Sequence, residues 1–139
     1  MNKVEKILIV DDDDDFRRLV STHLKNIYEN ILIDEYDLST KRNFPSESEC
    51  SNYDVMLLDH DLRLDQTGVS WFKSCKKVKD FPATIMITSL ANETMATHAL
   101  NSGVHYYLNK QKLSKEVLKN AVNLANEIKQ SRLKIVNEC

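Results

Sequence analysis

The chain is poor in the residues that mark linkers, disulfide frameworks and membrane spans. Two glycines and two prolines in 139 residues argue against collagen-like sequence, long linkers and a turn-rich β-sandwich. The three cysteines are far apart and form no CxxC pair, which predicts reduced thiols and neither a disulfide framework nor a zinc site. No segment approaches the roughly 18 apolar residues of a membrane helix, and the first apolar run is too short for a signal peptide. We therefore expect a cytoplasmic protein without membrane contact.

Charge and length are also unremarkable. The formal net charge is −2, so no basic excess points to nucleic acid, and we expect no direct nucleic-acid binding by this chain. A length of 139 residues suits one domain, large enough for a sheet covered by helices.

Two short apolar runs, each ending in aspartate, carry most of the information. Residues 7–10 (ILIV) precede the aspartates 11–15, and residues 55–58 (VMLL) precede Asp59. Such runs are typical of strands buried on both faces of a parallel sheet, whose carboxyl ends share one edge. Asp11, Asp12 and Asp59 are then expected to converge there. Clustered carboxylates repel unless a cation lies among them, which predicts a Mg²⁺ site.

Strand and helix patterns alternate along the whole chain, which predicts a doubly wound α/β fold with a five-stranded parallel sheet and helices on both faces. Asp13, Asn92 and Ser114 are predicted helix caps, and Gly103 a helix end. In the last helix, Val117, Ala121, Leu124 and Ile128 are expected to form the buried stripe. The expected strands are 4–10, 31–36, 53–59, 84–88 and 105–108; the main helices follow Asp13 and span 69–79, 92–103 and 114–130, with a short helix within 39–52.

Two more polar residues are predicted at the same edge of the sheet. Thr88 ends the fourth expected strand, and Lys110 follows the fifth. Each is weak alone, because strand-end threonines and surface lysines are common. Together with the carboxylates, in this order on successive strands, they indicate one site with a hydroxyl and an ammonium group.

These segments resemble the receiver domain of bacterial two-component response regulators over nearly all of residues 4–130. The resemblance implies a flavodoxin-like receiver fold for residues 1–130, with residues 131–139 as a helical C-terminal extension. No output domain follows, so the chain is either a stand-alone receiver or a receiver excised from a longer regulator. The matching segments are Ile7-Leu8-Ile9-Val10-Asp11-Asp12, Asp54-Val55-Met56-Leu57-Leu58-Asp59, Ile85-Met86-Ile87-Thr88-Ser89 and Gly103-Val104-His105-Tyr106-Tyr107-Leu108-Asn109-Lys110.

The resemblance also implies roles for individual residues. Asp59 would accept a phosphoryl group from a sensor histidine kinase or phosphotransfer protein, in a phosphoacceptor that catalyses its own phosphorylation and dephosphorylation and is not a dedicated enzyme. Asp11, Asp12, Asp59 and the backbone carbonyl of Asp61 would hold Mg²⁺.

On the same basis, Lys110 would pair with the phosphoryl oxygens, while Thr88 and Tyr107 would switch a surface made by the fourth helix, fifth strand and fifth helix. That surface would bind a partner or form a phosphorylation-dependent homodimer. Phosphoryl transfer to a carboxylate needs charge neutralisation and no general base, which agrees with these assignments.

The sequence departs from the family pattern near the site. The loop after Asp59 lacks the usual proline and is one residue longer before Gly68, and Gln111 replaces the proline after Lys110. Asp61 lies where the family tunes dephosphorylation and is a weaker alternative acceptor. His60 could be taken for a phosphocarrier, but we expect it to point away from the site.

Two other functions remain open from the sequence. Asp59-His60-Asp61 resembles the DxD motif of a HAD-type phosphohydrolase, with Asp59 as nucleophile and Asp61 as general acid and base. Against this, the acidic pair comes first in the chain and Arg63 replaces the usual threonine. The second alternative is a degenerate receiver that binds partners without phosphorylation.

Overall fold

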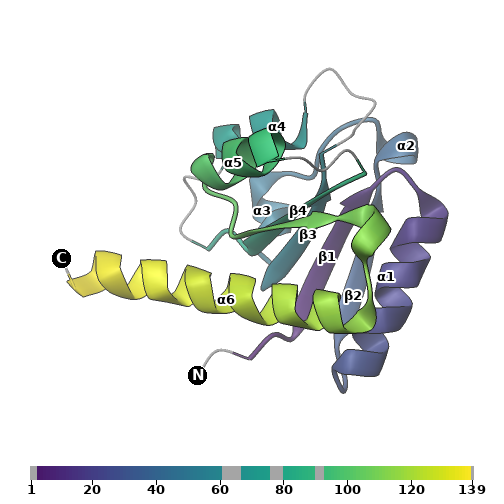
Figure 1. Cartoon of the computed structure of the whole chain (residues 1–139), viewed down its shortest axis with the longest axis horizontal. Helices are drawn as coiled ribbons and strands as arrows, with labels where there is room; N and C mark the ends of the chain where they lie inside the picture. The colour runs from purple at the N-terminus through teal and green to yellow at the C-terminus, as the bar shows by residue number, and fades with distance from the viewer. Residues whose placement is uncertain (1–2, 61–66, 76–79, 90–92, 139) are drawn as a thin grey trace.

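A computed structural model of the chain shows five parallel strands in the order β2-β1-β3-β4-β5, with helices on both faces (Figure 1). It describes residues 3–60, 67–75, 80–89 and 93–138, with side chains up to residue 133. This confirms the predicted doubly wound fold. The elements are β1 (Lys6–Asp11), α1 (Asp14–Ile27), β2 (Leu32–Asp37), α2 (Leu38–Lys41), α3 (Glu47–Cys50), β3 (Val55–Asp59), α4 (Gly68–Cys75), β4 (Ala83–Thr88), α5 (Glu93–Asn101), β5 (Tyr106–Asn109), the 3₁₀ helix η1 (Lys110–Lys112) and α6 (Lys115–Glu138).

The register of the strands brings their polar ends to one edge. Val10 pairs with Leu58, so Asp11 and Asp59 follow side by side at the ends of β1 and β3. Thr88 of β4 pairs with Asn109 of β5, directly before Lys110. A shift of one residue would move every side chain of a strand to the other face of the sheet. The packing of helices on both faces therefore opposes such a shift and stabilises this register.

Each face of the sheet has its own core. One face packs against α1 and α6, and the other against α3, α4 and α5 (Figure 1). The central strand β3 is buried along its whole length, as its unbroken apolar run predicts. Among the largest fully buried side chains are Ile7, Ile9, Leu57, Ile85 and Leu118 on the first face, and Met56, Leu58, Phe72 and Met86 on the second.

Helix ends follow the sequence signals where the structure describes them. The Asp13 side chain accepts hydrogen bonds from the backbone of Asp15 and Phe16, and Ser114 accepts one from Val117 at the start of α6. Gly103 follows α5 with φ of 104°, a left-handed conformation that favours glycine. Residue 92, the predicted cap of α5, lies outside the described residues. Where the sequence predicts one short helix within 39–52, the structure has two four-residue helices, α2 and α3, within 38–50.

The buried stripe of α6 differs from the sequence prediction, and in α1 one leucine is exposed as well. Leu19 of α1 and Leu124 of α6 are 47% and 42% exposed, so the predicted stripe through Leu124 is wrong. In α6 the face toward the sheet carries Leu118, Ala121, Val122 and Ala125. Two small alanines on this face allow a close approach of the helix to the sheet, which residue hydropathy alone does not reveal.

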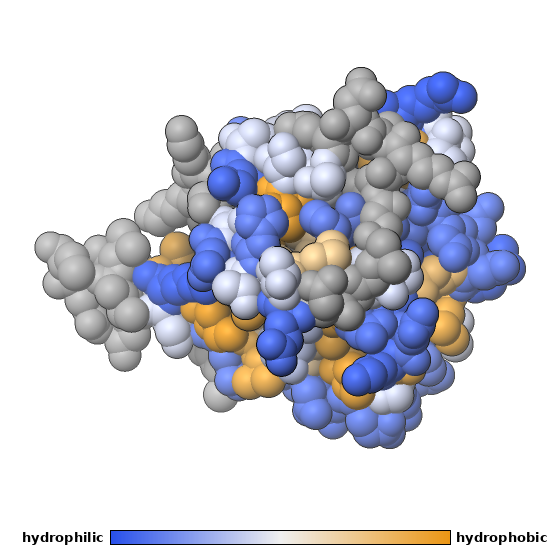
Figure 2. All heavy atoms as spheres, turned by 45° about the horizontal axis from the view of Figure 1, so that its top comes forward, coloured by the Kyte–Doolittle hydropathy of each residue, from blue (hydrophilic) through white to orange (hydrophobic). Residues whose placement is uncertain are grey.

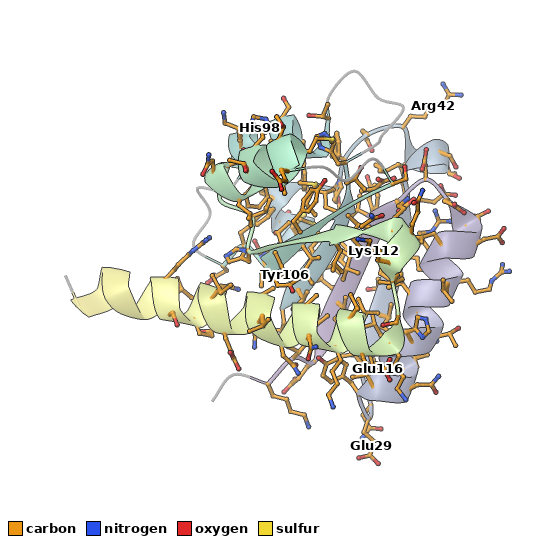
Figure 3. The ribbon with its side chains drawn as sticks, in the orientation of Figure 1. Glu29, Arg42, His98, Tyr106, Lys112 and Glu116 are labelled. Atoms are coloured by element: carbon orange, nitrogen blue, oxygen red, sulfur yellow. The ribbon has the colours of Figure 1, made fainter. Side chains whose placement is uncertain are left out.

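The surface of the described part is mixed in character. Figure 2 shows hydrophilic side chains over much of one face, with hydrophobic atoms in patches among them. Figure 3 shows Lys112 in the turn that leads into α6 and His98 on α5, at the far side of the sheet from α6. Among the described helices, we find none whose length and apolarity would let it cross a membrane.

Candidate functional site

Three aspartates meet at the carboxyl edge of the sheet, as the sequence predicts. Asp11 and Asp59 are each only 2% exposed, and Asp12 is half-buried. One carboxylate oxygen from each lies within 4.8 Å of the others. The Asp11 carboxylate is held in place, because its Oδ1 accepts a hydrogen bond of 2.9 Å from the backbone N–H of Asp13. Oxygen donors this close together are the ligands that Mg²⁺ prefers, so the residues present fit that ion.

Lys110 places its ammonium group between two of these carboxylates. Its Nζ lies 3.0 Å from Asp11 Oδ2 and 3.3 Å from Asp59 Oδ2, and 4.5 Å from the centre of the Phe16 ring. The chain turns here into η1, where Asn109 Oδ1 accepts a hydrogen bond from the backbone N–H of Gln111. Proline, the usual residue of the family at this position, has no N–H to donate, so Gln111 contributes a turn contact of its own.

The crowding of charges shifts two pKa values. Burial, followed by the charge of Asp59, raises the pKa of Asp11 from 3.8 to about 7. Burial opposes the charge of Lys110, but the carboxylates of Asp59 and Asp11 outweigh it and raise the pKa of the ammonium group. The site therefore attracts positive charge beyond that of Lys110, in the form of a proton or a metal ion.

The structure places Thr88 at the same edge, fully buried at the end of β4. Tyr107 pairs with Met86 and packs on the face of the sheet that carries α4 and α5, whereas Tyr106 packs on the α6 face. His60 lines a cavity between α4 and α5 together with Tyr107 and is not a member of the carboxylate cluster. The predicted residue Asp61 lies outside the described residues.

Gly68 begins α4 directly against the end of β3. A Cβ atom at this position would lie 2.6 Å from the carbonyl oxygen of Asp59 and 3.2 Å from the Cα of His60. Backbone atoms cannot give way as a side chain can, so only glycine fits this approach. Gly68 thus makes this contact although the sequence has one residue more than is usual before it.

Arg17 is a site-supporting residue that the sequence prediction missed. It is 5% exposed on α1, and its guanidinium donates to the backbone carbonyl of Asp11 at 2.8 Å. It also pairs with Asp14, with Glu35 at 3.2 Å and with Asp37 at 3.5 Å. The side chain thereby ties the ends of β1 and β2 to the first turn of α1. Its spacing of three and seven residues before the buried Val20 and Leu24 was an available signal.

Comparison with known proteins agrees with this geometry. The family described as the response regulator receiver domain matches residues 7–123. The transcriptional regulatory protein ResD of Bacillus subtilis (strain 168) is 30% identical over 115 residues, covering 81% of this chain and 45% of ResD. The chain thus spans about half the length of that relative.

Solved structures share the fold. A CheY-like response regulator receiver domain protein from Methanospirillum hungatei JF-1 has a TM-score of 0.72 at 19% identity, covering 94% of this chain and 99% of the other. A response regulator protein from Burkholderia pseudomallei, solved with a phosphorylated aspartic acid, a calcium ion and citrate, has a TM-score of 0.68 at 16% identity, covering 96% and 75%. On the family match, this chain belongs to the response regulator receiver domains of two-component signal transduction.

Proposed function

We propose that this receiver accepts a phosphoryl group on Asp59, in the presence of Mg²⁺, from the phosphohistidine of a sensor histidine kinase or a phosphotransfer protein. One observation carries the proposal: the buried Asp59 carboxylate lies beside Asp11 and Asp12 and within 3.3 Å of Lys110 Nζ. The response regulator from Burkholderia pseudomallei, which contains a phosphorylated aspartic acid, supports it by analogy. We propose residues 1–130 as the receiver and residues 131–139 as its helical extension.

The side chains of the site suit this transfer. A carboxylate oxygen of Asp59 attacks phosphorus as the bond to the histidine nitrogen breaks, and a carboxylate nucleophile needs no general base. Lys110 pairs with the phosphoryl oxygens, and the hydroxyl of Thr88 donates to them. Asp11, Asp12 and Asp59 would hold Mg²⁺, with the backbone carbonyl of Asp61 as a further ligand. When bound, the ion neutralises charge on the phosphoryl oxygens.

The same residues would couple the site to a surface for partners. Thr88 ends β4, which pairs with β3 and with β5, and Tyr107 lies on β5, which would form the surface for partners together with α5 and α6. A phosphoryl group can shift the population of two arrangements only through contacts that differ between them, and the contact with Thr88 would be one of these. Modification would then favour binding of a partner or formation of a homodimer through this surface.

The acceptor is tested by mass spectrometry after incubation with acetyl phosphate and Mg²⁺. The wild type should gain one phosphoryl group, and Asp59→Asn should gain none, because the amide is not a nucleophile at this edge. Asp54→Asn is the matched control at the other end of the same strand and should be modified normally. Labelling that persists in Asp59→Asn and disappears in Asp61→Asn would move the acceptor to Asp61.

The metal site is tested by thermal unfolding with and without Mg²⁺. At a concentration of 100 times its Kd, the ion should stabilise the fold by about 2.7 kcal/mol, since it binds only the folded site. Asp12→Ala should remove most of this gain, whereas Asp15→Ala, in the exposed first turn of α1, should retain it. A melting temperature of the wild type that does not respond to Mg²⁺ would refute the site.

The switch is tested by sedimentation and amide-shift mapping with beryllofluoride and Mg²⁺. We expect stronger self-association or partner binding and shifts across α5, β5 and α6. Thr88→Ala should weaken this response while leaving Asp59 open to modification. Shifts confined to the loops around Asp12 and Asp59 would identify a phosphoryl carrier without a conformational switch.

The alternatives give different results in these experiments. The family match speaks against a HAD-type phosphohydrolase built on Asp59 and Asp61. A degenerate receiver would bind its partner equally well with and without acetyl phosphate and would carry no label.

A further inference from the structure

A cavity between α4, α5 and the sheet is lined by none of the three clustered aspartates. Its volume is about 150 Å³. It lies beneath α5, on the face of the sheet opposite α6, with Val69 of α4 and Ala99 of α5 in its walls. The other walls come from β4 and β5 and from the first residue after β3, and include Met86, Met95, His60 and Tyr107.

The size and lining of this cavity suit an aromatic ring. An apolar cavity of about 150 Å³ in another protein stays dry and binds benzene. Here two methionine side chains, Met86 and Met95, contribute flexible, polarizable walls that make favourable contacts with ring edges. A ring held here would also lie against Tyr107, within reach of an aromatic contact.

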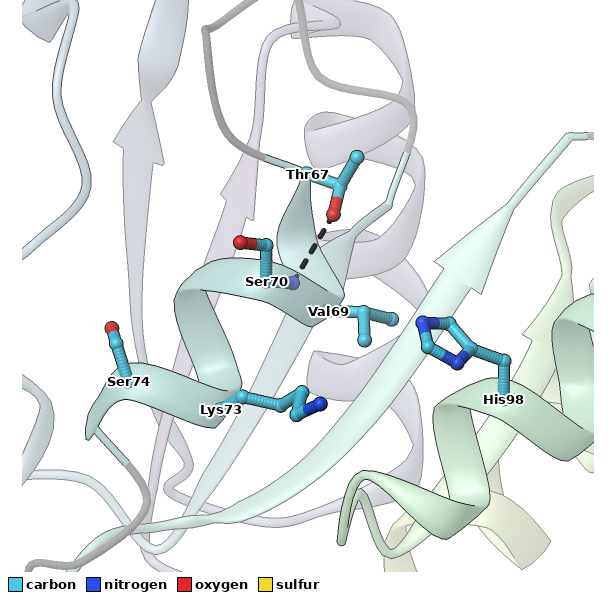
Figure 4. A pocket seen from close by; sticks show the side chains of 6 residues that line it. All are labelled: Thr67, Val69, Ser70, Lys73, Ser74 and His98. Carbon is cyan, nitrogen blue, oxygen red and sulfur yellow. Dashed lines mark hydrogen bonds between the residues drawn. The ribbon is translucent and has the colours of Figure 1, made fainter.

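A polar hollow of about 460 Å³ adjoins the cavity on the surface side. Val69 and His98 line both spaces, so the hollow is the natural entrance to the cavity. Figure 4 shows Lys73 reaching from α4 toward α5, and His98 reaching from α5 toward α4, with Val69 between them. The backbone N–H of Ser70 is directed to Thr67 Oγ1 at 3.1 Å, which fixes the start of α4 at the rim.

The positive charge at the entrance favours a negatively charged ligand. Lys73 supplies a positive charge, His98 supplies a ring N–H donor, and none of the described residues that line the hollow is acidic. An apolar cavity with a few convergent polar groups at its mouth is the usual form of a small-molecule site. We propose that this composite site binds a small aromatic carboxylate, with its ring in the cavity and its carboxylate against Lys73 and His98.

A regulatory consequence rests on the function proposed above. The cavity is open in the unmodified chain, so a ligand that fills it stabilises this arrangement around Tyr107. If modification of Asp59 rearranges Tyr107, it lowers the affinity for the ligand by some factor. By linkage, the bound ligand must then disfavour the modified state by the same factor. The ligand would then be an inhibitor of the switch.

Methionine methyl signals provide the test, because the chain has only four methionines and two of them line the cavity. The probes are benzoate, phenylacetate and 3-phenylpropionate, each compared with its alcohol, added to the unmodified ¹³C-methyl-methionine protein. We expect saturable shifts of Met86 and Met95, while the signal of Met56, buried on β3 outside the cavity, stays in place. The best acid should bind about five-fold tighter than its alcohol, the effect of one exposed ion pair of about 1 kcal/mol.

Two variants separate the two halves of the site. Lys73→Gln should reduce the affinity for the acid to that for the alcohol, whereas Lys119→Gln, an exposed helical lysine of α6, should change neither. Ala99→Leu should fill the cavity and abolish binding of both, and its unfolding midpoint verifies the fold. Equal binding of acid and alcohol in the wild type, or no saturable shift at Met86 and Met95, overturns the proposal. Because Asp59 takes no part in these measurements, failure here is distinct from failure of the phosphoacceptor.

Discussion

The two ends of β3 carry the same type of residue in opposite circumstances. Asp54, before the strand, accepts hydrogen bonds from the backbone N–H groups of Glu5 and Lys6 at 2.8 and 3.0 Å. Asp59, at its end, lies in a buried cluster with two other carboxylates and one ammonium group. The first aspartate ties β3 to the start of β1 and stabilises the fold. The second is held among like charges, an arrangement that suits the phosphoryl transfer proposed above.

The contrast extends to the whole sheet. At the amino edge, His105 Nδ1 accepts a hydrogen bond from the backbone of Thr84 at 3.0 Å, and Arg132 of α6 donates to the carbonyl of Gly103 at 2.9 Å. Polar side chains there satisfy single backbone groups. At the carboxyl edge, polar side chains meet one another. The carboxyl edge is therefore the edge at which a cation would relieve repulsion between side chains.

The largest difference in stability is expected between variants of the two arginines, one at each edge of the sheet. Arg17→Met should destabilise the protein by about 3 kcal/mol, because it leaves the Asp11 carbonyl and the paired carboxylates without their cation. Arg132→Met should change stability by only about 0.5 kcal/mol, since its single backbone contact is at the surface. Urea unfolding of the two variants measures this. Equal losses would show that both edges depend on their arginines to the same extent.

One titratable residue at each edge should also contribute to stability with an opposite dependence on pH. With its pKa raised to about 7, Asp11 keeps its proton in the folded protein, so its contribution to stability is present below pH 4 and is lost as the pH rises toward 7 without metal. Burial, and then the charges of Arg132 and Lys129, lower the pKa of His105 to about 4. Its contribution is present above pH 6.5 and is lost as the pH falls toward 4. Each effect should be on the order of 2 kcal/mol.

Difference profiles isolate these contributions. The free energy of unfolding is measured from pH 4 to pH 8 for the metal-free wild type and for the variants Asp11→Asn and His105→Asn. In each variant, the asparagine does not titrate. Asp11→Asn should gain stability relative to the wild type as the pH rises, and His105→Asn should gain as it falls. Mg²⁺ should help the wild type more at pH 7.5 than at pH 5, because it competes with a proton. Parallel profiles for all three proteins would contradict both assignments.

The smallest difference in stability is expected between variants of the two aspartates that flank the apolar run of β3. Asp54→Ala should destabilise the metal-free protein by about 1 kcal/mol, because two backbone donors at the surface lose their acceptor. Asp59→Asn should not destabilise it, since the change removes one of three repelling carboxylates. Thermal unfolding without divalent ions compares them. A loss in Asp59→Asn equal to that in Asp54→Ala would show that Asp59 also serves the fold.

Strand-end residues were the part of the site that the sequence predicted best. A strand buried on both faces ends where its apolar run ends. The sequence alone therefore places Asp11, Asp59 and Thr88 at strand ends. Helix faces were less predictable. Leu19 and Leu124 match the helical period but are exposed, because small Ser21 and Ala121 occupy the buried side where the helices approach the sheet closely.

Arg17 and the cavity beneath α5 lay beyond sequence reasoning for another reason. A charged residue in a buried stripe becomes meaningful only when its partners are known, and those of Arg17 come from β1, α1 and β2. The cavity is likewise a property of four elements at once, since Val69, Met86, Ala99 and Tyr107 are far apart in the chain. Periodicity describes one element at a time.

The contact between Gly68 and Asp59 has a consequence for engineering. The backbone N–H of His60 donates a hydrogen bond to the carbonyl of Ile87 at 2.9 Å, and Gly68 is pressed against the Asp59 carbonyl, so residues 60 and 68 are held next to each other. Doubling the length of a flexible connection between such points costs only about 0.6 kcal/mol of closure entropy. An epitope or a fluorescent reporter could therefore be spliced between residues 62 and 67, which leaves the proposed Mg²⁺ ligand at Asp61 in its place. Natural variation in length there would be tolerated for the same reason, provided that residue 68 remains glycine.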